Sequence, residues 1–209
     1  QRRRYLRKRI NLLEKQINDL SQRRMQNRSK REKNELFSAT LIGYTCAGKS
    51  TLFNKLTKSN VVESTKPFST LNPTTRRTYI SNETEILLSD TVGFIRKLPE
   101  DLISSFRATL EEINQSDLLI HIVDCSEDNF EEKIMSVEDT LIRTKLINHK
   151  RIIRFNKIDL INSETLNYIK SKYHQPCVSS TKNLGINDAR LEIEKIIQST
   201  FKKPKVISL

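Results

Sequence analysis

Short apolar runs alternate with longer amphipathic segments over most of the chain. The runs end in glycine or in polar residues, a pattern that is typical of buried strands. The runs that predict strands are Leu36–Ile42, Arg76–Ile80, Thr84–Leu88, Leu118–Asp124, Arg151–Asn156 and Cys177–Ser179.

Helical spacing of apolar residues follows most of these strands. The predicted helices are Lys49–Lys58, Glu100–Asn114, Phe130–Leu146, Ser163–Tyr173 and Ile186–Phe201, and the Ser-, Thr- and Asn-rich residues 59–75 predict a loop. This alternation predicts an α/β fold, a mostly parallel sheet flanked by helices on both faces. Ligands of such folds bind beyond the carboxyl ends of the strands, so polar residues at those ends are the candidates for chemistry.

The first part of the chain has a different pattern. Residues 5–33 contain no Gly or Pro, and apolar residues recur there at steps of four and three, at Leu6, Ile10, Leu13, Ile17 and Leu20. That spacing predicts one long helix with an apolar seam. The partner of the seam could be a preceding helix, a second copy of the chain or the body of the protein. We therefore predict a helical segment at 1–34 and a globular domain at 35–209 with a short basic tail.

Positive charge is concentrated in that helical segment. Residues 1–33 hold 13 Lys/Arg and 3 Asp/Glu, a net charge of +10 within a chain total of +12. Such an arm favours binding to nucleic acid or to another anionic surface. The alternative is a helix whose charges simply face water.

Composition and cysteine usage narrow the class of protein. The chain contains no run of 18 apolar residues, so we predict no membrane-spanning helix. Its three cysteines, Cys46, Cys125 and Cys177, are widely spaced and show no metal or disulfide pattern, which favours the reducing cytoplasm. The chain begins at Gln1 without a secretory signal, and we expect it to be a fragment of a longer protein or a processed one.

A loop with the pattern G-x-x-x-x-G-K-[ST] follows the first predicted strand and leads into a predicted helix. In such a loop, backbone N–H groups turn toward phosphate oxygens, and the start of the helix adds unpaired N–H groups. We predict that Lys49 contacts the β- and γ-phosphates, that the Ser50 hydroxyl binds Mg²⁺, and that Thr51 belongs to the same site. The loop is Gly43-Tyr44-Thr45-Cys46-Ala47-Gly48-Lys49-Ser50.

Two other strand ends carry matching chemistry. Asp90-Thr91-Val92-Gly93 follows the strand at 84–88, where the Asp90 carboxylate can hold Mg²⁺ through water and the Gly93 N–H can sense the γ-phosphate. By itself an Asp-x-x-Gly sequence could be an ordinary turn. The second strand end is Asn156-Lys157-Ile158-Asp159.

This second motif predicts the choice of base. The Asp159 carboxylate can accept hydrogen bonds from N1–H and the 2-amino group of guanine, whereas adenine would leave it unpaired. Asn156 can tie the motif to the phosphate loop, and the stem of Lys157 can cover the base. After the next short strand, one residue of the loop Ser179-Ser180-Thr181 can present a backbone N–H to the guanine O6. The predicted ligand is therefore GTP or GDP.

These motifs, in this order, resemble those of translation-factor-related GTPases and specifically those of the HflX family. The resemblance covers about residues 36–190, and the stretch that follows Asp90 is its most family-specific part. The matching residues are Gly43–Thr45, Ala47–Asn54, Thr70-Leu71, Pro73–Arg77, Leu88–Ile95, Leu98-Pro99, Phe106–Glu112, Asp117–Leu119 and Asn156–Asp159.

The resemblance implies a P-loop GTPase domain that hydrolyses GTP to GDP with Mg²⁺. It also implies a cytoplasmic protein that acts at the large ribosomal subunit and helps to split or rescue stalled ribosomes. Family members carry an N-terminal domain joined to the GTPase domain by a helical segment, which residues 1–33 resemble. The full-length protein would be a monomer.

The resemblance also places a first switch at Phe68-Ser69-Thr70-Leu71-Asn72, with Thr70 as a Mg²⁺ ligand in the GTP state. By chemistry alone, the hydroxyls of Thr74 and Thr75 are rivals for that role. The implied catalytic residues are Lys49, Thr70 and Gly93, and the implied metal ligands are Ser50 and Thr70.

The sequence departs from the family pattern at two positions. Cys46 stands where the family usually has an Asn that helps to bind a monovalent cation. Because a thiol is a poor ligand for a hard cation, potassium stimulation does not carry over from the family. Asn72 replaces a usual Asp. In addition, Phe94 follows Gly93 where some small GTPases have a water-orienting Gln, so we expect slow turnover without a ribosomal partner.

Other functions compete with this interpretation. A ribosome-assembly or tRNA-related GTPase would share the chemistry, but it is disfavoured by the stretch Asp90–Glu112. A nucleic-acid-binding module that binds nucleotide without turnover is disfavoured by the intact Lys49, Ser50, Asp90 and Asp159. An ATPase is also disfavoured by Asp159.

Overall fold

A computed structural model describes residues 36–59, 61, 70, 72–95 and 103–200. Within these residues, five strands form a single sheet in the order β2-β3-β1-β4-β5. All neighbours pair in parallel except β2, which is antiparallel to β3. The mostly parallel sheet is therefore confirmed. The strands are β1 (Phe37–Ile42), β2 (Thr74–Tyr79), β3 (Glu85–Asp90), β4 (Leu118–Asp124) and β5 (Arg151–Asn156).

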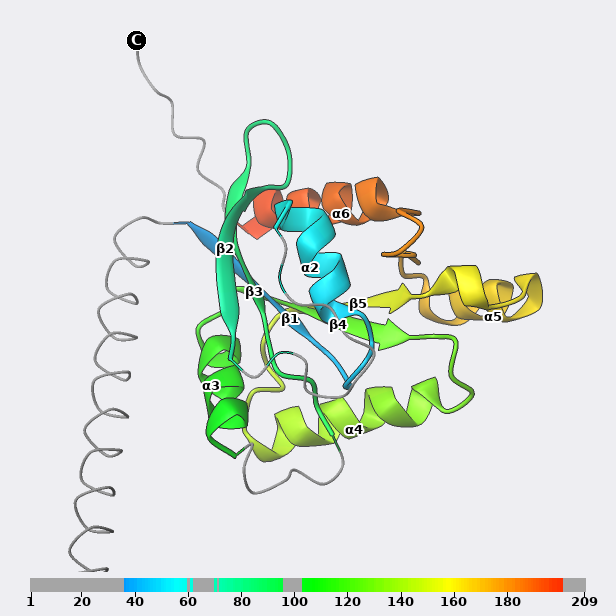
Figure 1. Ribbon diagram of the computed structural model, residues 1–209, viewed down its shortest axis with the longest axis horizontal. Helices are drawn as coiled ribbons and strands as arrows, with labels where there is room; N and C mark the ends of the chain where they lie inside the picture. The colour runs from blue at the N-terminus through cyan, green and yellow to red at the C-terminus, as the bar shows by residue number, and fades with distance from the viewer. Residues whose placement is uncertain (1–35, 60, 62–69, 71, 96–102, 201–209) are drawn as a thin grey trace, which may run out of the picture. The chain divides into compact units, whose positions relative to one another are not determined.

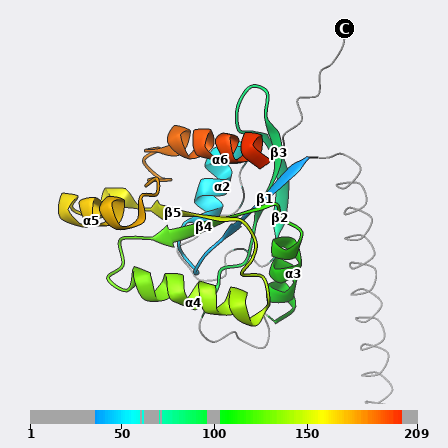
Figure 2. The same cartoon turned by 180° about the vertical axis from the view of Figure 1, so that it is seen from behind.

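Helices cover both faces of this sheet (Figure 1). Helices α2 and α6 lie on one face and α3 and α4 on the other, and the same layers are visible from behind in Figure 2. The α/β fold with helices on both sides is confirmed. The helices are α2 (Lys49–Thr57), α3 (Ile103–Asn114), α4 (Phe130–Arg143), the 3-10 helix η2 (Ile158–Leu160), α5 (Ser163–Tyr173) and α6 (Ile186–Thr200).

Each face of the sheet has its own apolar core. Successive side chains of a strand point to opposite faces, so Leu41 packs with α2 and α6, whereas its neighbour Ile42 packs with α3 and α4. A strand that is buried on both faces has no polar alternation, which is why β4 is apolar along nearly its whole length. A third cluster joins β5 to α4 and α5 around Phe155.

Arg190 of α6 fixes the carboxyl end of α2. Its guanidinium donates to the carbonyl oxygens of Leu56 at 2.9 Å and Lys55 at 3.3 Å, and to that of Tyr79 at 2.7 Å. These contacts satisfy carbonyl groups at the end of the helix that have no partner within it. Because α2 begins at the phosphate loop, this contact also steadies the helix on which that loop rests.

The hairpin strands differ from the sequence prediction by one or two residues at their ends. Strand β2 begins at Thr74 instead of Arg76, and β3 runs on to Asp90. Thr74 and Thr75, which we expected in a loop, pair in register with Asp90 and Ser89. Polarity suggested a loop at these threonines, but the β-branched side chain also suits a strand.

The end of α4 and the segment at 177–179 also differ from prediction. Helix α4 ends at Arg143, because Lys145 takes a left-handed backbone with φ of 60° and the Leu146 N–H turns back to the Leu141 carbonyl. Residues 177–179 form isolated bridges, Cys177 with Phe155 and Ser179 with Leu184, instead of a strand.

Some predictions lie outside the described residues. These include the helix expected at 5–33, the start of the helix expected at Glu100 and the basic tail. The domain boundary near residue 35 stays a prediction. Among the helices that the structure describes, none is long and apolar enough to cross a membrane.

Candidate functional site

The three predicted motifs meet at one edge of the sheet. The phosphate loop follows β1, the Asp90 motif ends β3, and the Asn156 motif ends β5. Because β1, β3, β4 and β5 run in parallel, their carboxyl ends share this edge. The contacts described below connect the motifs to one another.

Lys49 is buried at the start of α2. Its ammonium donates to the carbonyl oxygens of Tyr44 at 2.9 Å and Gly43 at 3.2 Å, within its own loop. Burial lowers the pKa of Lys49 to about 8, although the nearby Asp90 and Cys46 favour its charged form. A buried cation whose hydrogen bonds go to two backbone carbonyl groups is well placed to attract a phosphate group.

Three oxygen-bearing side chains converge beside this lysine. The Ser50 hydroxyl donates to Asp90 Oδ2 at 2.7 Å, the Thr70 hydroxyl donates to the same oxygen at 3.1 Å, and the two hydroxyls lie 2.9 Å apart. Among the described residues, the other carboxylate oxygen, Asp90 Oδ1, is buried and has no hydrogen-bond partner. Burial also raises the pKa of Asp90, with the Ser50 hydroxyl as the main opposing influence.

This cluster fits a magnesium ion. Mg²⁺ binds carboxylate, hydroxyl, water and phosphate oxygens and does not need several charged protein ligands. An unpaired buried carboxylate oxygen beside two hydroxyls supplies that donor type. Within the described part of the chain, no group of three or more His, Cys, Asp or Glu residues could hold a metal instead.

Of the two rivals of Thr70, Thr74 pairs in register with Asp90, whereas the Thr75 hydroxyl lies outside this cluster. The Thr75 hydroxyl is 2.8 Å from the Ser89 hydroxyl, which in turn donates to Glu112 Oε2 of α3 at 3.2 Å. Thr75 therefore faces α3. Glu112 is half-buried in this contact.

Gly93 lies against the phosphate loop. A Cβ atom at this position would lie 2.7 Å from Thr45 Cα and 2.9 Å from Lys49 Nζ, so only glycine allows this approach. The next residue pairs with the same loop, because Phe94 N–H donates to the Gly43 carbonyl at 3.0 Å and the Phe94 carbonyl accepts from Thr45 N–H at 2.9 Å. Thr91 and Val92 are fully buried behind this contact.

Asn156 connects the guanine motif to two other loops. Its side-chain N–H donates to the Ala47 carbonyl at 2.9 Å, and its side-chain oxygen accepts from Ser180 N–H at 3.1 Å and the Ser180 hydroxyl at 2.9 Å. A Cβ atom on Gly48 would lie 2.2 Å from Asn156 Nδ2. The predicted tie between the Asn156 motif and the phosphate loop is therefore present.

Asp159 keeps an acceptor free for a ligand. Among the residues that the structure describes, its Oδ1 atom is buried and has no hydrogen-bond partner. A buried oxygen without a donor costs free energy, and a guanine base would supply two N–H donors. Ser179 and Ser180 are buried nearby, and Thr181 is exposed.

The comparison with known proteins adds to this geometry. The family model described as "50S ribosome-binding GTPase" matches residues 38–157, which include the phosphate loop and the Asp90 motif and end within the Asn156 motif. The chain belongs to this GTPase family. Its fold, a parallel sheet with phosphate and guanine loops at the carboxyl edge, is the P-loop GTPase fold.

Curated relatives narrow the family to HflX-type GTPases. A GTPase HflX from Caldanaerobacter subterraneus subsp. tengcongensis is 40% identical over 99% of this chain and 46% of its own length. The GTPase HflX of Escherichia coli is 40% identical over 76% of this chain and 37% of its own length. The chain thus spans about half or less of the length of these relatives and corresponds to their GTPase domain.

Solved structures support the same fold. A GTP-binding protein from Sulfolobus solfataricus in complex with GDP superposes with a TM-score of 0.62 at 25% identity, covering 91% of this chain and 62% of that one. An Era variant from Aquifex aeolicus bound to GDP and AlF4⁻ gives a TM-score of 0.63 at 22% identity, covering 83% of this chain and 60% of that one. At that identity the second match speaks for the fold alone.

The GTPase domain has one charged strand end that the sequence interpretation did not single out. Asp124 ends β4 as Asp90 ends β3 and Asn156 ends β5. Its Oδ2 atom is 2.5 Å from Lys157 Nζ. The signal was available in the sequence, since Asp124, like Asp90 and Asn156, is a polar residue at the end of a largely apolar strand.

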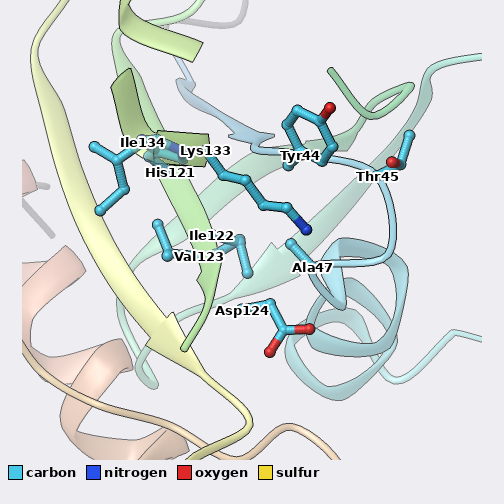
Figure 3. Close-up of a pocket in the computed structure, with 9 residues that line it drawn as sticks. All are labelled: Tyr44, Thr45, Ala47, His121, Ile122, Val123, Asp124, Lys133 and Ile134. Carbon is cyan, nitrogen blue, oxygen red and sulfur yellow. The ribbon is translucent and has the colours of Figure 1, made fainter. Parts of the chain in front are cut away.

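A small cavity lies behind the phosphate loop of the GTPase domain (Figure 3). Its volume of about 10 Å³ is the size of one water molecule. The Lys133 side chain crosses it, with Nζ 4.9 Å from the centre of the Tyr44 ring. His121 is buried at its edge, and burial lowers the pKa of His121 to about 3, so this histidine is neutral and belongs to the core. The cavity is far too small for a nucleotide.

The remaining predicted site residues are placed as follows. Thr51 is half-buried in α2, Cys46 is half-buried in the phosphate loop with φ of 62°, and Asn72 is exposed. Phe94 is buried and packs edge-on against Phe106 of α3, with ring centres 5.4 Å apart. Phe68, Ser69 and Leu71 lie outside the described residues.

Proposed function

We propose that this chain binds Mg-GTP at the carboxyl edge of its sheet and hydrolyses it to GDP, and that it does so at the large ribosomal subunit. The observation that carries the proposal is that two buried carboxylate oxygens, in two different motifs, lack a hydrogen-bond donor. Asp90 Oδ1 lies in the predicted metal cluster and Asp159 Oδ1 in the guanine motif, and both lack a hydrogen-bond partner among the described residues. Mg-GTP would supply a partner to each.

The residues of the phosphate loop have separate tasks in this mechanism. Lys49, which is held by the Tyr44 and Gly43 carbonyls, exchanges these acceptors for oxygens of the β- and γ-phosphates. The N–H groups at the start of α2 bind the same phosphates. Ser50, Thr70 and Asp90 would hold Mg²⁺ directly or through water. When bound, the ion neutralises phosphate charge as the γ-phosphate leaves.

Residues around Gly93 would respond to the γ-phosphate. Gly93 approaches Thr45 and Lys49 closely, and we infer that its N–H group reaches that phosphate. The neighbouring Phe94 is packed into the apolar core and has no group that could orient a water molecule. We therefore expect slow hydrolysis by the free chain. The ribosomal partner would supply or order the missing group.

The partner is inferred from the family. The matching model describes ribosome-binding GTPases of the 50S subunit, and the HflX resemblance implies a cytoplasmic protein that splits or rescues stalled ribosomes. Residues 1–33 carry a net charge of +10, which suits phosphate groups of ribosomal RNA. Such contacts weaken as salt is raised. The full-length protein would act as a monomer.

Hydrolysis with and without purified large ribosomal subunits tests this proposal. We expect slow release of phosphate from GTP by the chain alone, at least ~10-fold stimulation by the subunit, and no stimulated hydrolysis of ATP. Equal turnover of GTP and ATP would overturn the choice of nucleotide. Binding of GTP without any stimulation by the subunit would overturn the ribosomal partner within this part of the protein.

A further inference from the structure

The lysine of the guanine motif is held by a carboxylate that belongs to none of the three motifs. Lys157 Nζ lies 2.5 Å from Asp124 Oδ2. The Asp124 side chain is 5% exposed and that of Lys157 is 31% exposed, so the pair lies at the boundary between the protein and its ligand site. Strand β4, which Asp124 ends, lies between β1 and β5 in the sheet. Asp124 therefore stands between the phosphate loop and the guanine motif.

The Asp124 carboxylate is fixed independently of the lysine. Its second oxygen, Oδ1, accepts hydrogen bonds from Ser126 N–H at 3.0 Å and from the Ser126 hydroxyl at 2.6 Å. Both carboxylate oxygens thus have partners, and the group is not free to rotate. Figure 3 shows Asp124 beside Ala47 of the phosphate loop, the residue whose carbonyl accepts from Asn156.

Lys157 is also fixed at its backbone. It has a left-handed conformation with φ of 69°, an arrangement that is unfavourable for a residue with a side chain. Its neighbour Asn156 is bonded to Ala47 and Ser180, and η2 begins directly after it. A lysine that is held at both ends must lay its methylene groups along one path, as an apolar edge with the charge at its far end.

We propose that Asp124 is a positioning residue for guanine-nucleotide binding. By holding the Lys157 ammonium, it fixes the aliphatic stem of Lys157 as the wall against which the purine base packs. The inference rests on the proposed function, since it concerns the same nucleotide site. In this proposal, Asp159 selects the base. The pair Asp124–Lys157 raises the affinity for the purine ring without selecting among purines.

This division of roles makes a specific prediction for two nucleotides. The stem of Lys157 touches the face of a purine and not its edge, so it cannot distinguish guanine from hypoxanthine, which lacks the 2-amino group. Loss of Asp124 would let Lys157 regain many rotamers, which must be lost again on binding. GDP and IDP should then be weakened by the same factor.

The Asp124→Asn variant of the whole chain tests the proposal. The amide keeps the shape of the side chain and an acceptor for Ser126, but it removes the charge that holds Lys157. We expect the dissociation constants of GDP and IDP to rise together by ~10-fold, mainly through faster dissociation, which fluorescent GDP reports directly. The kcat for GTP should stay unchanged, because the site of the γ-phosphate lies at Gly93 and Asp90.

Two further variants control for a merely structural effect. Glu138→Gln breaks an ion pair of similar length, 2.6 Å to Arg151, between α4 and β5; it should leave nucleotide affinity unchanged. The double variant Asp124→Asn with Lys157→Met should bind GDP no more weakly than Lys157→Met alone, because Asp124 acts through Lys157.

The outcomes separate this inference from the proposed function. An unchanged GDP affinity in Asp124→Asn, or additive effects in the double variant, would overturn the positioning role while the wild-type chain still binds GDP. A lower melting temperature with unaltered affinity would do the same. If the wild-type chain binds no guanine nucleotide, the proposed function fails, and the inference fails with it.

Discussion

Individual residues of this site are kept in states that cost the free protein stability. Lys49 is charged and buried, Asp159 has a buried oxygen without a donor, and Cys46 and Lys157 have left-handed backbones. Such features are typical of binding sites, where a ligand relieves them. The stability of the chain should therefore depend strongly on nucleotide.

Lys49→Met should stabilise the nucleotide-free chain and at the same time weaken nucleotide binding. Burial that lowers the pKa of Lys49 from 10.5 to about 8 corresponds to ~3 kcal/mol below pH 8. Removing the charge should raise the melting temperature of the nucleotide-free chain by about 6–12 °C and abolish tight binding of GTP. Thermal unfolding with and without Mg-GTP measures both effects.

The pH dependence of this effect has a defined sign. Between pH 8 and 10.5 the unfolded chain keeps the Lys49 proton that the folded chain has lost, so the contribution of this group to the free energy of unfolding rises with pH. The stability advantage of Lys49→Met should therefore shrink across that range. An advantage that grows with pH would contradict the assignment of the pKa shift to Lys49.

The pair Thr70→Ala and Thr75→Ala distinguishes Thr70 from Thr75, one of its two rivals as metal ligand. Only the Thr70 hydroxyl is bonded to Asp90 in the cluster with Ser50, whereas Thr75 contacts Ser89. We expect Thr70→Ala to lower Mg²⁺-dependent GTP hydrolysis by ~10-fold or more and Thr75→Ala to change it by less than ~3-fold. A larger loss in Thr75→Ala, measured by titrating Mg²⁺ at fixed GTP, would reverse the assignment.

At the scale of elements, the site lies where the ends of several strands meet. The side chain of Asn156 joins the loops that follow these strands. Asn156 links β5 to the phosphate loop and to the loop at 179–181. The same Asn lies so close to Gly48 that no side chain fits there. Loss of Asn156 should therefore separate loops that together enclose a nucleotide.

Asn156→Ala and Asn162→Ala form a matched pair for this claim. Asn162 caps α5, where its side chain accepts from Thr165 N–H at 2.8 Å, away from the site. Both variants should lower stability, the second by ~1 kcal/mol, but only Asn156→Ala should weaken GDP binding, by ~10-fold or more. If the two variants bound GDP with equal affinity in a competition assay with fluorescent GDP, the loops would hold their places without Asn156.

Much of the arrangement of strands, helices and motifs was predictable from the sequence, and the predictions that were wrong have physical causes. The phosphate loop, the Asp90 motif and the Asn156 motif were each placed at a strand end, because apolar runs define strands and parallel strands bring their ends together. Thr74 and Thr75 were taken for loop residues, since polarity alone does not show a strand at the edge of a sheet. The end of α4 was missed because a left-handed Lys145, unlike a glycine, gives no signal in the sequence.

Contacts between distant side chains were the least predictable part. Ser89 with Glu112 and Asp124 with Lys157 join residues far apart in the chain, and no local spacing encodes them. The register of the sheet decides which side chains meet. The sequence predicted which residues lie at the strand ends, but it did not predict which other side chains they contact.

At the scale of the whole molecule, the described residues bring the phosphate loop, the Asp90 motif and the Asn156 motif together in one body. Its apolar clusters lie within the described part of the domain, and so do the contacts that join the phosphate, metal and guanine motifs. The basic segment at 1–33 would add ribosome contacts to this body without taking part in base recognition. Nucleotide choice should thus be a property of the body alone.

The dissociation constants of GDP, ADP and XDP for the whole chain and for Asp159→Asn test the central claim most directly. Calorimetric titration in the presence of Mg²⁺ should show ADP binding at least ~100-fold more weakly than GDP to the wild-type chain, because adenine leaves the Asp159 carboxylate unpaired. In Asp159→Asn the amide offers a donor to the 2-oxo group of xanthine, so XDP should replace GDP as the preferred ligand. Equal binding of GDP and ADP to the wild-type chain, or an unchanged preference for GDP in the variant, would contradict a guanine site built on Asp159.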